Sequence, residues 1–180
     1  MELSHQHRRF LLVSQCGFQT VFNFVENGLI AWLIHGSSNT VAIWNRFGGI
    51  ILDILLTGFF LPFLICIIIS PIVAGQVRSG KVPPLPPEQF PHWRWFRRSF
   101  WIRGLILGIA GVIFGALPLV SALILGQAQS FPMVSYVMFK AIWAAMLASL
   151  VAPIIGWWAL ANASRKLLGA SGRELQQGAF

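Results

Sequence analysis

Four long apolar segments dominate the sequence, at about residues 10–34, 48–74, 101–127 and 134–161. A helix needs roughly 20 mostly apolar residues to cross the hydrocarbon core of a bilayer. Each segment is long enough to cross, and the longer ones would tilt to fit. We therefore predict an all-α integral membrane protein with four transmembrane helices, in which residues 1–180 form a single membrane domain.

The composition supports this prediction and argues against a soluble fold. Hydrophobic residues make up 56% of the chain and charged residues only 10%, whereas a soluble domain carries about 25% charged residues. A soluble protein of this size could not keep so much apolar surface out of water. The formal net charge of +8 would suggest nucleic acid in a soluble protein. Here the basic residues flank the apolar segments, so we interpret them as topology signals and expect no nucleic-acid partner.

The distribution of basic residues predicts the orientation, because cytoplasmic loops of membrane proteins are enriched in Lys and Arg. Of the thirteen basic residues, the segments that join or flank the helices on one side hold eleven, and the opposite side holds one, Arg46. This bias predicts that both termini are cytoplasmic, in what we take to be a bacterial cytoplasmic membrane. The eleven residues are Arg8, Arg9, Arg78, Lys81, Arg94, Arg97, Arg98, Arg103, Arg165, Lys166 and Arg173.

The predicted cytoplasmic loop, residues 75–100, begins with a proline-rich part. The run from Lys81 to Pro87 favours a stiff polyproline II conformation. Lys81, Pro84 and Pro87 have the spacing of an SH3-type ligand. Such spacing arises easily in proline-rich linkers, so we prefer to interpret this part as a rigid spacer.

The second part of the loop combines aromatic and basic residues before the third helix. On a helix, Trp93, Phe96 and Phe100 would share one face, with the arginines largely on another. Aromatic rings and guanidinium groups both suit the headgroup layer of a membrane. We predict a short interfacial amphipathic segment whose contacts with anionic lipid headgroups come from Trp93, Trp95, Arg94, Arg97 and Arg98.

The third and fourth apolar segments carry stripes of small residues. In a membrane, helices associate through close backbone approach at such residues, because lipid tails are as apolar as leucine. We therefore predict that these two helices pack tightly on each other, with a homodimer seam as the alternative. The stripe of the third segment is Gly104, Gly108, Gly111 and Gly115, and that of the fourth includes Ala141, Ala145, Ala148, Ala152 and Gly156.

Three ionisable residues lie inside the apolar segments: Glu26, Asp53 and Lys140. At 1.5 Å per residue, Glu26 lies about 24 Å along the first helix, while Asp53 and Lys140 lie about 7 and 9 Å from the outer ends of theirs. All three therefore belong to the outer part of the bilayer. They could form a buried cluster there, with Asn23 and Asn27 as hydrogen-bond partners.

This cluster has two interpretations. In the structural one, Lys140 extends outward to the interface, Asp53 already lies there, and amides satisfy Glu26 or desolvation keeps it protonated. In the functional one, Glu26 and Asp53 line a polar cavity that binds a cation or proton, with Lys140 as the counter-charge.

The chain shows no catalytic set, no phosphate-binding loop and no metal or cofactor motif. We therefore predict a non-enzymatic accessory or structural membrane component, with membrane lipids as partners and a homo-oligomer or a larger membrane complex as its setting. The alternative is a small transporter or a cation- or proton-binding protein that uses the polar cluster. An enzyme acting on lipids is a third option, which only the basic-aromatic loop favours.

Overall fold

The computed structural model describes residues 5–45, 49–90 and 99–177, with side chains through residue 169. The described chain is mostly helical. Three helices are long and apolar enough to cross a membrane, Ile50–Arg78, Phe100–Leu125 and Met133–Gly169. These helices fit an integral membrane protein, as the sequence predicted.

The first predicted helix also forms, as one helical rod of three parts. These are α1 (His5–Arg9), the π-helical η1 (Phe10–Gly17) and α2 (Phe18–His35). The rod is not among the three apolar helices that could cross a membrane by length and composition. Its five polar side chains, from Gln15 to Asn27, lower its hydropathy.

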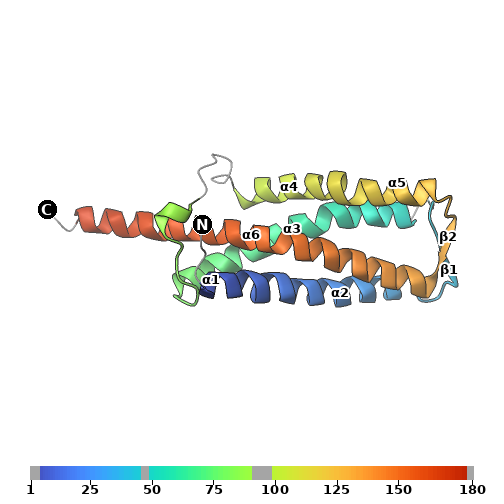
Figure 1. Cartoon of the computed structure of the whole chain (residues 1–180), viewed down its shortest axis with the longest axis horizontal. Helices are drawn as coiled ribbons and strands as arrows, with labels where there is room; N and C mark the ends of the chain where they lie inside the picture. The colour runs from blue at the N-terminus through green and yellow to red at the C-terminus, as the bar shows by residue number, and fades with distance from the viewer. Residues whose placement is uncertain (1–4, 46–48, 91–98, 178–180) are drawn as a thin grey trace.

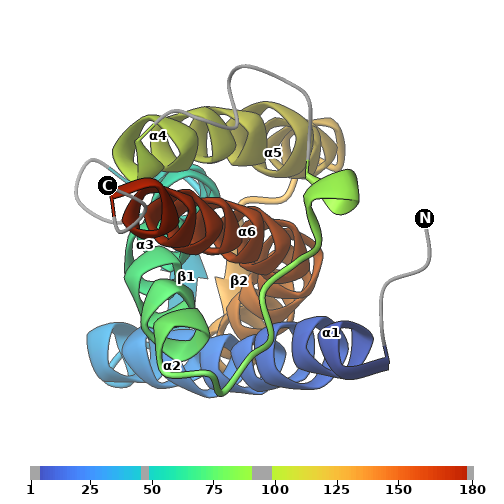
Figure 2. The same ribbon diagram turned by 90° about the vertical axis from the view of Figure 1, so that its left-hand side faces the viewer.

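The other elements lie alongside this rod, and the two short strands lie together at one end of the bundle (Figure 1). Helix α6 packs against α2 and α3, while α4 packs against α3. Figure 2 shows α6 between α2 on one side and α4 with α5 on the other. In chain order the elements are β1 (Thr40–Ala42), α3 (Ile50–Arg78), the 3-10 helix η2 (Pro87–Gln89), α4 (Phe100–Ala110), the π-helical η4 (Gly111–Ala116), α5 (Leu117–Leu125), β2 (Ser130–Pro132) and α6 (Met133–Gln177).

The sheet of β1 and β2 corrects the purely helical prediction. The strands are antiparallel, with Val41 opposite Phe131. Val41 and Ile43 are buried in a hydrophobic cluster with helix residues at this end of the bundle. Three-residue strands are too short to produce a recognisable alternation of apolar and polar residues. The ribbon joins the two loops at this end and so holds the two helical hairpins together.

The fourth predicted helix was expected to end at residue 161, but α6 continues to Gln177. The predicted cytoplasmic tail, residues 162–180, is therefore helical over most of its length. Within this extension, Ser164 Oγ donates a hydrogen bond to the Leu160 carbonyl at 2.8 Å. Leu160, Ala161 and Ala163 are buried there, so the apolar face of α6 continues past the point where the sequence becomes more polar.

The proline-rich segment covers this extension of α6, and we call residues 79–90 the strap. Leu85 N–H donates to Ser164 Oγ at 2.8 Å, and His7 Nε2 donates to the Pro83 carbonyl at 2.9 Å. The Arg165 guanidinium lies 5.3 Å from the centre of the Phe90 ring. The strap is therefore attached to the bundle at three places, contacts that the prediction of a rigid spacer did not include.

Burial along the strap repeats every three residues. Val82 and Leu85 are buried, whereas Lys81, Pro84 and Pro87 are exposed. This period matches the three residues per turn of polyproline II. The backbone of Pro86, with φ −66° and ψ 149°, has the same conformation. One face of the strap therefore packs on the bundle and the other faces outward.

Replacing Leu85 with alanine is expected to detach the strap. Leu85 is only 1% exposed, and its truncation should weaken the attachment by about 2 kcal/mol. Because 1.4 kcal/mol is a factor of ten, trypsin should cut after Lys81 about 30-fold faster wherever cleavage requires the strap to open. Pro84→Ala is the control, since Pro84 is exposed. Equal cleavage rates in wild type and Leu85→Ala would contradict the anchoring role.

The small residues of the third predicted helix pack on α3 rather than on α6. A Cβ added to Gly104 would lie 3.1 Å from the Phe63 ring, and one on Gly108 would lie 2.9 Å from the Phe59 carbonyl oxygen. Gly111 lies against Gly58. Gly115 alone of the four lies against α6, where a Cβ would be 2.9 Å from the Trp143 ring.

The small residues of α6 face the first helix instead. A Cβ on Gly28 would lie 3.3 Å from Ala141 Cβ, and one on Gly156 would lie 2.8 Å from Gln15. The predicted pairing of the third and fourth helices through their stripes is therefore wrong. A small-residue stripe allows close approach by any helix, and it does not specify which neighbour approaches.

The predicted interfacial segment lies outside the described residues. Its lipid-contacting residues, Trp93, Arg94, Trp95, Arg97 and Arg98, fall between positions 91 and 98. Those contacts remain a prediction. The described neighbours on either side are η2, which ends at Gln89, and α4, which begins at Phe100.

Candidate polar site and membrane groove

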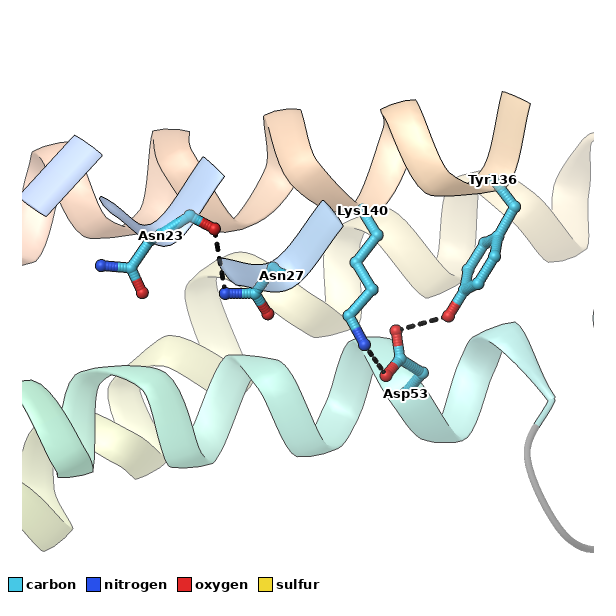
Figure 3. A network of polar contacts seen from close by, with 5 residues as sticks. All are labelled: Asn23, Asn27, Asp53, Tyr136 and Lys140. Atoms are coloured by element: carbon cyan, nitrogen blue, oxygen red, sulfur yellow. Dashed lines mark hydrogen bonds and ion pairs between the residues drawn. The ribbon is translucent and has the colours of Figure 1, made fainter. Parts of the chain in front are cut away.

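A buried ion pair joins α3 to α6 near the end of the bundle that carries the β-ribbon. Lys140 Nζ donates to Asp53 Oδ1 at 2.5 Å, and Tyr136 Oη donates to Asp53 Oδ2 at 2.7 Å. Figure 3 shows the carboxylate between these two donors. Asp53 lies in the first turn of α3. Tyr136 and Lys140 are four residues apart on α6 and so share one face.

The burial of this triad explains its arrangement. Tyr136 is 1% exposed, and the side chains of Lys140 and Asp53 are 7% and 25% exposed. Removing two charges from water is costly, and their attraction offsets the cost only when the remaining hydrogen-bonding groups are satisfied. Here both carboxylate oxygens of Asp53 have a donor. The triad is therefore a closed clamp between α3 and α6, and the position that a cation would take beside Asp53 is filled by Lys140.

The clamp also touches the first helix. The ring of His35 lies edge-on to the Tyr136 ring, with centres 5.2 Å apart and planes at 87°. This T-shaped geometry is one of the preferred arrangements of aromatic pairs. Because His35 is the last residue of α2, the contact brings the ends of three helices together around Asp53.

Glu26 does not join this cluster. Among the described residues, no hydrogen bond or ion pair connects it to Asp53 or Lys140, and its side chain is exposed. Asn23 Nδ2 donates to the Gln19 carbonyl at 2.8 Å, and Asn27 Nδ2 donates to the Asn23 carbonyl at 3.1 Å. Figure 3 shows the Asn27 amide bonded to the Asn23 carbonyl oxygen rather than to Lys140. The predicted five-residue cluster thus separates into a clamp and a polar stripe on α2.

The polar stripe forms one wall of a long groove between the first helix and α3. We call this the stripe groove; its volume is about 620 Å³. The opposite wall is apolar except for Thr57 and, at one end, Gln76. From Ser14 to Ile30 the groove runs about 24 Å along the first helix. This length is most of the thickness of a bilayer's hydrocarbon core, which is roughly 30 Å. The stripe residues that line it are Gln15, Gln19, Asn23, Glu26 and Asn27.

The hydrogen-bond acceptors of the stripe groove differ in exposure, because the Glu26 carboxylate is exposed whereas two amide oxygens are buried. Gln15 Oε1 and Gln76 Oε1 are buried acceptors without a partner in the part of the chain that the structure describes. Glu26 adds a carboxylate nearer the opposite end. The described residues contain no group of three or more His, Cys, Asp or Glu that could hold a metal ion. The groove therefore presents acceptors to a ligand rather than a ready metal site.

Sequence reasoning placed Asp53 and Lys140 at similar depth but missed Tyr136 and His35. A signal for Tyr136 was present, because it is the single tyrosine of the chain and precedes Lys140 by four residues. For His35 there was no signal beyond its position at the end of a helix. The stripe groove depends on how α2 is oriented about its own axis relative to α3. A single sequence does not reveal this orientation.

Comparison with known proteins adds no family to this description. No protein-family model matches the chain, and no curated protein or solved structure is significantly similar to it. The function must therefore be inferred from the clamp and the stripe groove themselves.

Proposed function

We propose that this protein is a non-enzymatic accessory subunit of a membrane complex and that a transmembrane helix of its partner lies in the stripe groove. The observation that carries this proposal is the exposed, unpaired carboxylate of Glu26 on a polar groove wall. The clamp at Asp53 supports it, because the clamp stabilises the bundle and leaves the groove as the polar surface open to a ligand.

The proposal includes four transmembrane helices with both termini in the cytoplasm of a bacterial cell. The first helix supports this count because it runs beside α6 (Figure 1) and packs on it. If α6 crosses the bilayer, the rod beside it, which runs from His5 to His35, is long enough to cross with it. The low hydropathy of the first helix then results from the stripe. The excess of Lys and Arg on one side supports the orientation.

A transmembrane partner explains the stripe better than lipid does. Ionisable side chains inside a bilayer are costly and almost always face other protein groups or a wet cavity. Glu26 has no protein partner within the described residues, and the groove that it lines is open, with a mostly apolar opposite wall. A helix has a diameter of about 10 Å with its side chains, and about 16 of its residues would fill a groove 24 Å long. Such a helix would bury Glu26 and supply donors to the stripe.

The charge of the groove indicates what the partner helix carries. A lysine, arginine or other hydrogen-bond donor at the depth of Glu26 would complement the carboxylate. Within its described spans, a second copy of this chain supplies no free lysine or arginine at this depth. Lys140 is bound to Asp53, and Arg103 lies in the first turn of α4, at the opposite end of the bundle. We therefore propose a different protein as the partner.

Site-specific photo-crosslinking from Phe22 tests this proposal. Phe22 lines the groove and is 50% exposed. A photoreactive residue at this position is expected to produce an adduct with a second polypeptide in native membranes. The same residue at Leu150, which is 67% exposed on α6, is the control and should react with lipid. Adducts with lipid alone from both positions, or with this chain alone, would contradict a heteromeric partner.

The transport alternative depends on Glu26, because Lys140 and Tyr136 already occupy the carboxylate of Asp53. Glu26→Gln separates the two functions. An accessory subunit should retain its partner with the isosteric, neutral amide, since glutamine still accepts hydrogen bonds. A cation- or proton-dependent flux in proteoliposomes that disappears with Glu26→Gln would favour the transporter and overturn the accessory role.

A further inference from the structure

Arg103 is a buried arginine that has no partner among the described residues. It lies in the first turn of α4 and is 6% exposed. Its Nε and Nη1 atoms are fully buried, and no described group forms a hydrogen bond with them. The one ion pair among the described residues is that of Asp53 with Lys140, so no described carboxylate neutralises the guanidinium.

The surroundings of Arg103 also favour an anion. Its neighbours across the interface are apolar or weakly polar: the Phe63 ring lies next to Gly104, and Cys66 Sγ donates to the Phe100 carbonyl at 3.5 Å. A cation in such a place requires a counter-charge. Helix α4 begins at Phe100 and has eleven residues. Ser99 Oγ accepts a hydrogen bond from the Trp101 N–H at 3.3 Å, and the helix dipole adds positive potential at the same end.

The depth of Arg103 matches the headgroup layer. It lies three residues, or about 4.5 Å, past the start of the helix. Trp101 and Ile102 beside it are 55% and 40% exposed, as expected for residues that contact lipid at an interface. Guanidinium groups bind phosphate oxygens through paired hydrogen bonds. The charge and the depth of Arg103 therefore agree with a phosphate ligand.

We propose that Arg103 binds the phosphate group of an anionic ligand at the start of α4, with an anionic phospholipid of the adjacent leaflet as its source. Free phosphate has the same chemistry and is the alternative source. The inference requires that α4 cross the membrane, but it does not depend on the stripe groove, which lies between the first helix and α3.

Ligand-induced stabilisation in detergent tests the proposal. The purified chain in an uncharged detergent would be unfolded by heat, with its eight tryptophans as the fluorescence probe. Phosphatidylglycerol, phosphatidylcholine with the same acyl chains, and inorganic phosphate would be added separately, at matched ionic strength. Phosphatidylglycerol is expected to raise Tm by several degrees, and the other two by much less.

Three variants make the result specific. Arg103→Gln is expected to lose most of the increase in Tm, and Arg103→Lys to keep part of it as a point charge. Arg78→Gln is the matched control, because Arg78 is exposed at the same end of the bundle, and it should keep the full increase. If Arg103→Gln does not fold, the reduced increase in Arg103→Lys still decides the question.

The possible outcomes differ clearly. Equal increases in wild type and both Arg103 variants would overturn the site, as would an equal response to phosphatidylcholine. An increase with inorganic phosphate as large as that with phosphatidylglycerol would overturn the lipid source. A wild-type Tm that no additive changes would indicate that a protein carboxylate fills the site, and would overturn the phosphate ligand.

Discussion

Replacing Lys140 with methionine is expected to lower the free energy of unfolding by about 3 kcal/mol. The substitution keeps most of the side-chain volume but leaves the Asp53 carboxylate without its counter-charge in the bundle. Removing one partner of a buried ion pair typically costs 3–5 kcal/mol. We expect the lower end because the Asp53 side chain is 25% exposed. Denaturant-induced unfolding in mixed micelles, followed by tryptophan fluorescence, measures the change.

A double-mutant cycle shows whether this effect comes from the clamp. Asp53→Asn removes the negative charge that Lys140→Met would leave without a counter-charge. Asparagine still accepts a hydrogen bond from Tyr136. The double variant is therefore expected to be more stable than Lys140→Met alone, with a coupling energy of about 1–3 kcal/mol. If the two single effects simply add, the ion pair does not hold α3 to α6, and the closed-clamp interpretation is wrong.

The second large effect is expected at the crossing of α3 and η4. A Cβ on Gly111 would overlap the Gly58 carbonyl oxygen and lie 3.0 Å from Pro62 Cγ. Pro62 has no N–H, so it leaves that carbonyl without its usual partner four residues later in the helix. Because residue 111 is a glycine, the backbone of η4 approaches this free carbonyl closely enough for a weak Cα–H···O contact.

Gly111→Ala is therefore expected to destabilise the protein by about 3 kcal/mol, because it forces two backbones apart rather than moving a flexible side chain. Gly75→Ala is the matched control. Gly75 also lies within a helix, and a Cβ there would have no atom within 4 Å. That control should be neutral or slightly stabilising, since alanine favours helix over glycine. Equal unfolding midpoints for the two variants would exclude close packing at Gly111.

The sequence predicted the helices well because the signal for them is local. An apolar run of sufficient length favours a helix in lipid whatever its neighbours are. The same reasoning placed Asp53 and Lys140 at similar depth, since depth follows from counting residues at 1.5 Å each. Local reasoning could not find the β-ribbon, whose strands have three residues each. It also ended α6 too early, because the strap that bonds to Ser164 in the extension comes from a distant part of the chain.

What the sequence alone determined was the type of protein, the positions of its apolar helices and the set of polar residues inside them. The tertiary structure decided which of these residues meet. Lys140 pairs with Asp53 rather than with Glu26, and Gly111 packs on α3 rather than on α6. The rotation of each helix and the identity of its neighbour decide both contacts. A charge pairs with whichever opposite charge faces it, and a glycine accepts any helix that approaches. These contacts join residues that are far apart in the chain, so no local sequence pattern predicts them.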